Sequence, residues 1–457
     1  MRIGVLLALV LICLLRMGAA HASDSRLASH VGQVRLGELN AILKARYLRV
    51  LTIKNPYDYY VHKGEMKGVQ YEMVREFVAH LNRKYAKKKR ELKIAFELIP
   101  VDFDQLIPML TEGRGDLVAV GLTRTPERDA EVEFTLPYQV VRDVIVTRKE
   151  LAKESWKGKT FLVQADSSYL RAIEESGEDV DVRAVDANLN AENVMEMVSL
   201  KGADYTLVNS YWAERIGRRF KNLTMLDDQP FRKEVEVGWA VRKGSPELLK
   251  ELNAFIPKVR KGTLLGNTFG QKYFDNLSRL HRDFDLAAQK ISNYDASIKK
   301  YAKQYGFDWR LLAALCLEES QFRQEIDNKF GAVGLFQIKQ STADEPYVSV
   351  GPIRGKANAD NNIHAGVKYL AWLKKSFFDS EDQLSEDERL RMMLAAYNAG
   401  PARVQEAIGK ARRMGLNPHV WFRNVEVAML SLGVPETVLY VSEINKHYVS
   451  YLLLGIK

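Results

Sequence analysis

Cysteine is nearly absent from this chain, with only Cys13 and Cys316 among 457 residues. Cys13 lies inside an N-terminal apolar run, so that removal of this run would leave a single thiol and no intramolecular disulfide. Metal-binding spacings of cysteine and histidine are missing, as are a Walker A loop and a G-x-S-x-G elbow. We therefore expect no metal and no other cofactor.

Long hydrophobic runs beyond the N-terminus, internal repeats and low-complexity tracts are missing as well. With 46% hydrophobic and 27% charged residues, the composition is that of a globular protein. The length predicts two or three domains, each with its own core. The excess of 67 basic over 58 acidic residues is mild. It suits an anionic polymer or a membrane surface, and we expect no nucleic-acid partner.

The first 22 residues have the features of a cleavable export signal. Arg2 precedes an apolar run at residues 3–15, and Ala20-His21-Ala22 gives a small-residue cleavage site. The alternative is an N-terminal membrane anchor, for which the run is short. No small residue stands directly before Cys13, so we do not expect lipidation. The sequence predicts an exported protein.

Residues 35–262 alternate between strand-like and helical patterns. Apolar strand-like stretches at 48–53, 93–99 and 116–122 are separated by stretches with helical spacing at 69–85 and 102–113. This β-α-β-α-β succession predicts a parallel sheet covered by helices. Further strands are expected at 137–148, 160–164, 180–185 and 205–208, a helix at 191–201, and a strand followed by a helix within 235–262.

Two segments of this region resemble the extracellular solute-binding proteins that capture polar amino acids. They are Gly121 to Arg128 (GLTRTPER) and Glu133 to Tyr138 (EFTLPY). The resemblance implies a two-lobed α/β fold in which Arg128 and the Thr123 hydroxyl grip a ligand carboxylate. Asn209 stands where members that bind free amino acids place an ammonium-binding aspartate, which argues against such a ligand. The alternative is a domain kept only as a scaffold.

The chain changes character after residue 262. Residues 263–290 carry glycines and mixed charges and are expected to connect two domains. From 291 to 457 helical periodicity dominates, which predicts an all-α domain. Within it, Leu312, Leu315 and Glu319 fall on one helical stripe, so that a carboxylate lies where a helix normally buries apolar groups. We interpret Glu319 as a catalytic acid; alternatively, Glu318 and Glu319 end a core helix at the surface.

Four segments of this domain, in this order, resemble the lytic transglycosylases with goose-lysozyme-like domains. In the second of these segments, at residues 331–338, Phe336 stands where methionine is usual. A further, structural match lies around 361–370. The segments are Glu319 to Phe322 (ESQF), Gly331 to Ile338 (GAVGLFQI), Ala395 to Gly400 (AAYNAG), and Glu436 to Ile444 (ETVLYVSEI).

This resemblance implies the chemistry and the site. Glu319 would protonate the glycosidic oxygen and then act as a base, with no second carboxylate of the matched segments assigned a catalytic role. The 6-hydroxyl of the substrate's own N-acetylmuramic acid residue would attack the cleaved centre, which yields a 1,6-anhydro sugar. Tyr440 would position groups around the acid, Gln337 and Asn398 would bind acetamido groups, and Ser320 and Tyr397 would line the cleft. Alternatively, the two tyrosines are core aromatics and the two amides are helix caps. Cys316 is expected to be a packed thiol.

Together the two parts resemble the membrane-bound lytic murein transglycosylase F family. The resemblance implies an enzyme that cleaves the glycan strands of peptidoglycan, exported to the periplasm and peripheral at the outer membrane of a Gram-negative cell. The N-terminal domain would bind a muropeptide or another cell-wall peptide. A binding receptor with an inactive glycan-docking domain and a hydrolytic muramidase are the two alternatives.

Overall fold

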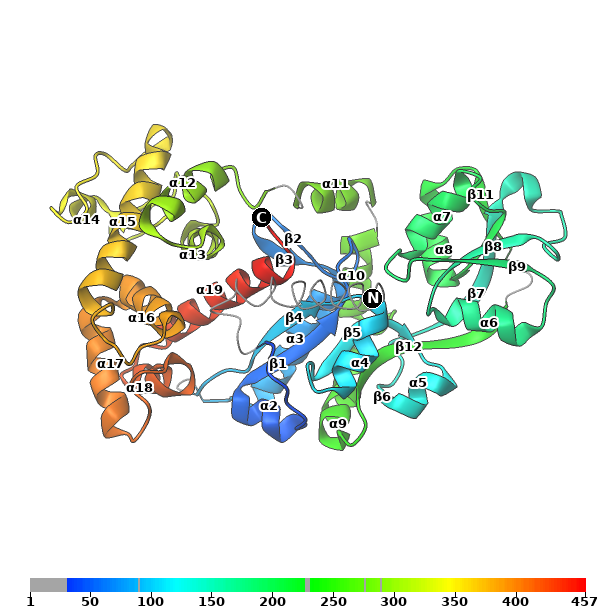
Figure 1. Cartoon of the computed structure of the whole chain (residues 1–457), viewed down its shortest axis with the longest axis horizontal. Coiled ribbons are helices and arrows are strands. Elements are labelled where there is room, and N and C mark those ends of the chain that lie inside the picture. Colours follow the sequence, from blue (N-terminus) through cyan, green and yellow to red (C-terminus); the bar gives the residue numbers. More distant parts are fainter. Residues whose placement is uncertain (1–30, 89–90, 227–230, 275–276, 288–289) are drawn as a thin grey trace, which may run out of the picture. The chain divides into compact units, whose positions relative to one another are not determined.

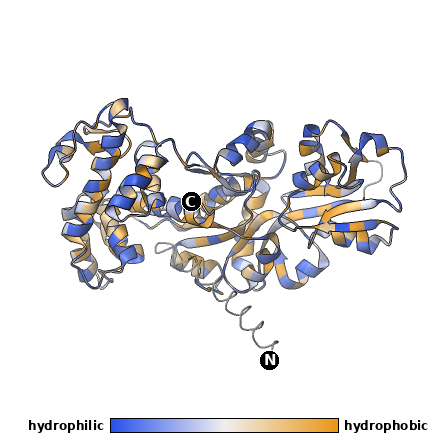
Figure 2. Cartoon of the chain, turned by 45° about the horizontal axis from the view of Figure 1, so that its top comes forward, coloured by the Kyte–Doolittle hydropathy of each residue, from blue (hydrophilic) through white to orange (hydrophobic). Residues whose placement is uncertain are grey.

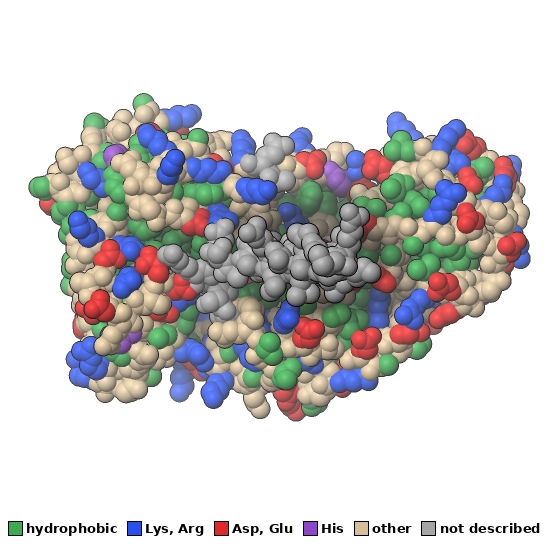
Figure 3. All heavy atoms as spheres, viewed as in Figure 1, with side chains coloured by type: hydrophobic (Ala, Val, Ile, Leu, Met, Phe, Trp, Pro, Cys, Tyr) green, Lys and Arg blue, Asp and Glu red, His purple; other side chains and the backbone are tan. Residues whose placement is uncertain are grey.

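The computed structural model describes residues 31–88, 91–226, 231–274, 277–287 and 290–457 (Figure 1). The expected export signal at 1–22 lies outside these residues. The described chain forms two compact units, one made of residues 34–87 and 93–290 and the other mainly of residues 291–457. On the face shown in Figure 3, basic and acidic side chains are interspersed, as the mild net charge leads one to expect.

The N-terminal unit is built on one sheet whose strands follow the order β4-β1-β5-β12-β7-β10-β8-β9. Parallel pairs join β1 to β4 and β5, and β8 to β9 and β10. All of these strands except β9 are largely buried, and hydrophobic residues run through the sheet in Figure 2. The strands are β1 (Tyr47–Thr52), β4 (Ala95–Pro100), β5 (Leu117–Thr123), β6 (Val132–Phe134), β7 (Gln139–Arg148), β8 (Thr160–Gln164), β9 (Asp181–Val185), β10 (Tyr205–Asn209), β11 (Leu223–Leu226) and β12 (Arg232–Arg242); β2 (Tyr60–His62) and β3 (Glu65–Lys67) form a separate hairpin.

The sheet has two halves that meet at β12. The first part of β12 pairs antiparallel with β7, and its last part pairs with β5 and β6. We call the half with β1, β4, β5 and β6 lobe 1 and the half with β7 to β11 lobe 2. This arrangement confirms the two-lobed α/β fold. The helices of the unit are α2 (Leu39–Ala45), α3 (Val69–Tyr85), α4 (Leu106–Thr111), α5 (Pro126–Glu131), α6 (Ser168–Ser176), α7 (Ala191–Ser199), α8 (Ser210–Ile216), α9 (Pro246–Phe255), α10 (Leu264–Phe274) and α11 (Leu277–Ala287).

Helices α10 and α11 correct the expectation that residues 263–290 are a linker. Tyr273, Phe274 and Leu280 are buried in a core cluster with residues of α7, α8 and β7. The Phe274 ring also stacks on that of Tyr57, with centroids 5.6 Å apart. Mixed charge on the outer faces of these helices made the segment resemble a connection, although its apolar side chains belong to the core of the N-terminal unit.

A polar cluster ties α11 to both lobes. Tyr57, which follows β1 in lobe 1, donates a hydrogen bond to Glu192 on α7 of lobe 2 at 2.6 Å. His281 of α11 places its Nε2 atom 2.9 Å from the same carboxylate and 3.2 Å from the Tyr57 hydroxyl. Arg219 also pairs with Glu192. The α11 helix is therefore bonded to one group from each lobe.

The C-terminal unit is helical, as predicted, and contains one short hairpin in its described residues. The hairpin pairs β13 (Ala332–Val333) with β14 (Ile338–Lys339), where the glycine-containing loop folds back on itself. No helix within the described ranges is long and apolar enough to cross a membrane. The helices are α12 (Asp295–Tyr305), α13 (Trp309–Ser320), α14 (Gln340–Asp344), α15 (Ala359–Phe377), α16 (Glu386–Ala399), α17 (Pro401–Arg413), α18 (Glu426–Ser431) and α19 (Pro435–Leu453).

Candidate active site and ligand cavity

Glu319 lies in the last turn of α13, a helix with an almost entirely buried body. Asp308 caps the start of this helix by accepting a hydrogen bond from the Arg310 backbone. Residues Leu311 to Leu317 are all buried. The helix ends because Gln321 and Phe322 adopt left-handed backbone angles, with φ of 53° and 58°. The carboxylate is thus carried by a rigid element and lies immediately before a sharp turn.

Tyr440 of α19 is the hydrogen-bond partner of Glu319. Its hydroxyl donates to Glu319 Oε1 at 2.5 Å. Burial raises the pKa of Glu319 to about 7, the Tyr440 hydrogen bond opposes this rise, and the nearby charge of Glu318 adds to it. Glu318 itself is exposed. A carboxyl group with a pKa near neutrality exchanges its proton readily at physiological pH, which is what an acid that must later act as a base requires.

The loop after α13 is held by two buried amide side chains that sequence reasoning did not single out as functional. Gln324 accepts a hydrogen bond from the Leu335 backbone and donates to the carbonyls of Ile353 and Gly355. Asn362 of α15 accepts from the Phe336 backbone and donates to the Val333 carbonyl.

Gly334 lies where these two amides meet. Its φ is +75°, and a Cβ atom there would lie 2.4 Å from Nδ2 of Asn362 and 2.7 Å from Oε1 of Gln324. A side chain at this position would therefore displace both anchors, and glycine also tolerates the left-handed backbone. The glycine-rich loop is fixed by its close approach to the two amides.

Ser320 does not line a substrate cleft, which corrects the expectation for this residue. It is 2% exposed, and its hydroxyl donates to the carbonyls of Cys316 and Leu335. The serine therefore ties the end of α13 to the loop. Cys316 is a free, fully buried cysteine, as expected for a packed thiol.

Phe336 and Gln337 also serve the loop rather than an open surface. The Phe336 side chain is fully buried against Gly366, so its departure from methionine changes the packing of α15 and not the lining of a cleft. Gln337 donates its amide hydrogens to the carbonyls of Ile326 and Gly334. Because both donors are used, only the Gln337 carbonyl oxygen remains to bind an acetamido N–H.

Tyr397 and Asn398 lie at the end of α16. The Tyr397 hydroxyl donates to the Phe336 carbonyl at 2.6 Å, and its pKa is raised well above the usual value by burial and by the charge of Glu319. Asn398 is exposed, and its Oδ1 accepts a hydrogen bond from Thr437 of α19. Its amide N–H groups have no partner among the described residues. Glu319, Tyr397 and Tyr440 are therefore brought together by three different helices.

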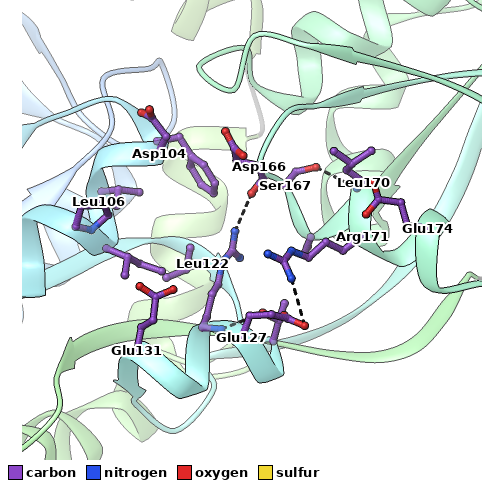
Figure 4. Close-up of a pocket in the computed structure, with 16 residues that line it drawn as sticks. Asp104, Leu106, Leu122, Glu127, Glu131, Asp166, Ser167, Leu170, Arg171 and Glu174 are labelled. Carbon is purple, nitrogen blue, oxygen red and sulfur yellow. Dashed lines mark hydrogen bonds and ion pairs between the residues drawn. The ribbon is translucent and has the colours of Figure 1, made fainter.

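A second candidate site is a cavity of about 660 Å³ in the N-terminal unit (Figure 4). One wall comes from lobe 1, at residues 103–108 and 122–131, and the other from residues 166–174 of lobe 2. Arg128 lines this cavity. Its guanidinium donates to the carbonyls of Thr123 and Asp166 and lies 5.6 Å from the Phe103 ring centroid.

The charge of Arg128 is not compensated by a carboxylate within ion-pair distance among the described residues. Burial and the charges of Arg171 and Arg232 lower its pKa to about 10. The two neighbours are paired, Arg171 with Glu127 at 3.3 Å and Arg232 with Asp143. Figure 4 shows the first of these pairs beside the cavity. The lining also carries the acidic side chains of Asp104, Glu127, Glu131, Asp166 and Glu174, so among the described residues Arg128 is an unpaired cation in a cavity of mixed charge.

The side chains of Thr123 and Asn209 do not act as ligand-binding groups in the cavity. Thr123 is buried, does not line the cavity and contributes its carbonyl to Arg128, which corrects the expectation of a ligand-binding hydroxyl there. Thr125 of the same segment does line the cavity, and its side chain caps α5. Asn209 caps α8 by accepting from the Trp212 backbone, so its side chain is engaged in the fold.

Comparison with known families agrees with this division of the chain. Residues 48–276 match the model of the bacterial extracellular solute-binding proteins, family 3, and residues 296–419 match that of the transglycosylase SLT domain. The first match extends into α10, in agreement with the packing of that helix. Tyr440 lies beyond the second match, so its place in the site rests on geometry.

Curated relatives match along most of the chain. A membrane-bound lytic murein transglycosylase F of Desulfosudis oleivorans is 29% identical over 395 residues, covering 83% of this chain and 82% of its own. One from Pseudomonas fluorescens is 29% identical over 389 residues, covering 82% and 75%. The chain is thus a two-part enzyme in which a solute-binding unit precedes a transglycosylase domain. It belongs to the bacterial extracellular solute-binding proteins, family 3, through its N-terminal unit, and along most of its length it is similar to membrane-bound lytic murein transglycosylase F.

Solved structures of amino-acid-binding and other transporter-associated binding proteins are similar to about half of the chain. The ancestral amino acid-binding protein AncCDT-1 is 25% identical and covers 52% of this chain and 99% of its own, with a TM-score of 0.43. A binding component of an ABC transporter from Wolinella succinogenes, complexed with lysine, is 22% identical and covers 51% and 98%, also with a TM-score of 0.43.

Proposed function

We propose that this protein cleaves the β-1,4 bond between N-acetylmuramic acid and N-acetylglucosamine in peptidoglycan and leaves 1,6-anhydro ends. The observation that carries the proposal is the pairing of Glu319 with Tyr440 at the end of a buried helix, with a pKa of about 7 for the carboxyl. Tyr440 engages Oε1, which leaves Oε2 to carry the proton that is donated.

The proposed reaction uses one carboxyl group twice. Protonated Glu319 donates to the glycosidic oxygen as the bond from C1 breaks, and the substrate's acetamido oxygen supports the positive charge at C1. The Glu319 carboxylate then removes the proton of the 6-hydroxyl, and O6 bonds to C1. One C–O bond is broken, one is formed, the proton returns to Glu319, and no water is consumed.

A hydrolytic muramidase would place a second carboxylate across the sugar from the acid. Glu318 is the neighbouring carboxylate, but adjacent residues of a helix point in directions about 100° apart. Burial raises the pKa of both carboxyls, but Glu318 is the more exposed of the two and only Glu319 is hydrogen-bonded to Tyr440. This difference supports the anhydro product over hydrolysis.

Mass spectrometry of digested sacculi tests the reaction. Anhydro ends are expected, whereas reducing ends would indicate the muramidase and intact glycan the receptor. Replacing Glu319 with Gln should reduce the rate by about a hundred-fold to ten-thousand-fold, because the proton donor is lost. Glu426→Gln is the matched control: burial also raises the pKa of Glu426 to about 7, but its carboxylate accepts from the Arg423 backbone and has no part in the site. Anhydro ends at the wild-type rate from Glu319→Gln would refute the assignment.

We further propose that the cavity at Arg128 binds a carboxylate-bearing cell-wall peptide and thereby modulates the transglycosylase. The uncompensated guanidinium supports an anionic ligand. The asparagine at position 209 cannot neutralise an ammonium group, which disfavours a free amino acid. The scaffold alternative predicts no ligand at all.

Calorimetry with muropeptides tests this second proposal. Arg128→Ala should abolish the heat of binding and the change in turnover that muropeptides cause. Arg124→Ala is the matched control, because Arg124 lies in the same segment but pairs with Asp129 and Glu236 at the surface. Absence of heat and of any change in turnover with the wild-type protein would contradict the proposal.

We propose that the protein is exported and acts in the periplasm, peripherally at the outer membrane. The family description of the N-terminal match and the names of the relatives support this location. Fractionation of cells that express the full chain, with a salt wash to release peripheral proteins, is the direct test. Recovery in the cytoplasm would contradict it.

A further inference from the structure

A row of aromatic rings extends from Tyr397 along the surface of α15. The ring centroids of Tyr397 and Tyr369 are 5.6 Å apart, and those of Tyr369 and Trp372 are 5.8 Å apart. Trp372 stacks on Tyr347 at 4.0 Å with 14° between their planes, and Phe377 meets Trp372 edge-on at 5.4 Å. We call Tyr347, Tyr369, Trp372 and Phe377 the aromatic row.

The row begins at the candidate active site. Tyr397 is the residue next to the aromatic row. It is fixed by its hydrogen bond to the Phe336 carbonyl, and the charge of Glu319 contributes to its raised pKa. Tyr369 contacts Tyr397 and also packs on the core cluster that contains Val333 and Ile338 of the loop hairpin. A polymer bound at Glu319 therefore has the aromatic row next to it.

The polar tips of the row face solvent. The hydroxyls of Tyr347 and Tyr369 and the indole N–H of Trp372 have no hydrogen-bond partner among the described residues, and they are not among the buried polar atoms that lack one. Trp421 contrasts with Trp372, because its ring is fully buried and its N–H is unpartnered inside the core. Half-buried rings with free polar tips suit sugar rings, which offer an apolar C–H face and hydroxyl groups.

Two lysines flank Trp372 on the same helix. Lys368 lies one turn before it and Lys375 one turn after it, and neither has an ion-pair partner within the described part of the chain. Free ammonium groups beside a row of rings favour a ligand that carries carboxylates. Sugar rings with attached carboxylates, as in N-acetylmuramic acid and its peptides, combine both features.

We infer that the aromatic row is a binding subsite for the glycan strand, beyond the two sugars that flank the bond to be cleaved. The inference rests on the proposed function, because the strand reaches the row from Glu319. The row would hold long strands by ring stacking and by contacts of Lys368 and Lys375 with carboxylates. Short oligosaccharides that end before the row would not use it.

Kinetics on two substrates test the inference. Trp372→Ala should raise KM about ten-fold for long peptide-free glycan strands, with kcat within about two-fold, which corresponds to the loss of one aromatic contact. The values for a tetrasaccharide of the same repeat should not change. Trp372→Phe should retain most of the affinity. Trp309→Ala is a matched control, since Trp309 is a half-buried tryptophan of the same unit outside the row.

Two results would overturn the inference. One is an unchanged KM for long strands in a Trp372→Ala protein that melts like the wild type, which would leave the row as a surface for a protein partner. The other is an equal loss on both substrates, which would mean a structural role. Binding of strands to Glu319→Gln, with and without Trp372→Ala, separates this inference from the proposed reaction. If the wild type makes no anhydro ends but Trp372→Ala weakens binding of the strands, the proposed reaction is refuted and the proposed subsite is supported.

Discussion

The environment of Glu319 makes both stability and activity depend on pH. Its pKa is raised from 4.5 to about 7, so the folded protein binds this proton more tightly than the unfolded chain does. The resulting contribution to stability is present below pH 4.5 and is lost as the pH rises through 7. The free energy of unfolding of Glu319→Gln should therefore exceed that of the wild type by about 2 kcal/mol at pH 8. At pH 4 the two free energies should be nearly equal. Denaturant unfolding at the two pH values measures this; an equal effect at both would contradict the raised pKa.

Tyr440 offers a sharper test of the same pair. Its hydrogen bond lowers the pKa of Glu319 against the effect of burial, so Tyr440→Phe should raise that pKa further. The alkaline limb of the profile of kcat against pH should move to higher pH, while kcat at the optimum falls about ten-fold because Oε1 loses its donor. Tyr448→Phe on the same helix, which removes a hydrogen bond to Asp308, should leave the limb in place. A lower kcat without a shift would show that Tyr440 only packs.

At the scale of residues, the sequence predicted the buried position of the Glu319 carboxylate better than its surroundings. The stripe of Leu312, Leu315 and Glu319 was enough to place a carboxylate against buried groups. Ser320 was assigned to a cleft by the resemblance of the ESQF segment to lytic transglycosylases, but a helix turns by about 100° per residue, and this rotation buries its hydroxyl. No local pattern distinguishes these two orientations before the packing partners are known.

The loop between α13 and α14 depends on amides that are distant in sequence. Asn362→Ala should lower the free energy of unfolding by about 2 to 3 kcal/mol, because the backbone N–H of Phe336 and the carbonyl of Val333 would lose their buried partner. Turnover should fall as well, since Tyr397 is anchored on the same loop. Asn361→Ala, which removes a bond to the Pro352 carbonyl at the surface, is the control. Similar losses from both variants in chemical denaturation would argue against a special role for Asn362.

At the scale of elements, periodicity located most helices and strands, but not the contacts that fix the loop. The segments at 48–53, 93–99 and 116–122 correspond to β1, β4 and β5 within a few residues. The roles of Gln324 and Asn362 could not be inferred, because an amide bonds to whichever backbone groups the fold brings near it. The glycines of the loop indicated a backbone turn, whereas the close approach of Gly334 to the two amides is visible only in the structure.

The extent of the N-terminal unit can be tested with two fragments. A fragment of residues 31–290 should unfold in one cooperative transition, whereas one of residues 31–262 should melt at a lower temperature and bind a hydrophobic dye. The shorter fragment lacks Tyr273, Phe274 and Leu280, which are buried against α7 and α8. Differential scanning calorimetry compares the two. Equal melting temperatures would restore the linker interpretation of residues 263–290.

For the whole molecule, the sequence predicted the two folds and their order, because each has its own periodicity. It did not predict where the first ends. Helices α10 and α11 have amphipathic patterns that fit either a connection or an outer layer of a core. Only the stacking of Phe274 on Tyr57 and the burial of Leu280 decide between them.

The bonds of His281 have a mechanical consequence. A relative rotation of lobe 1 and lobe 2 must either separate Tyr57 from Glu192 or drag His281 along with one of them. His281 precedes the start of the catalytic unit by only ten residues along the chain. Any change in the angle between the lobes must therefore break or rearrange the bonds of this one histidine on α11.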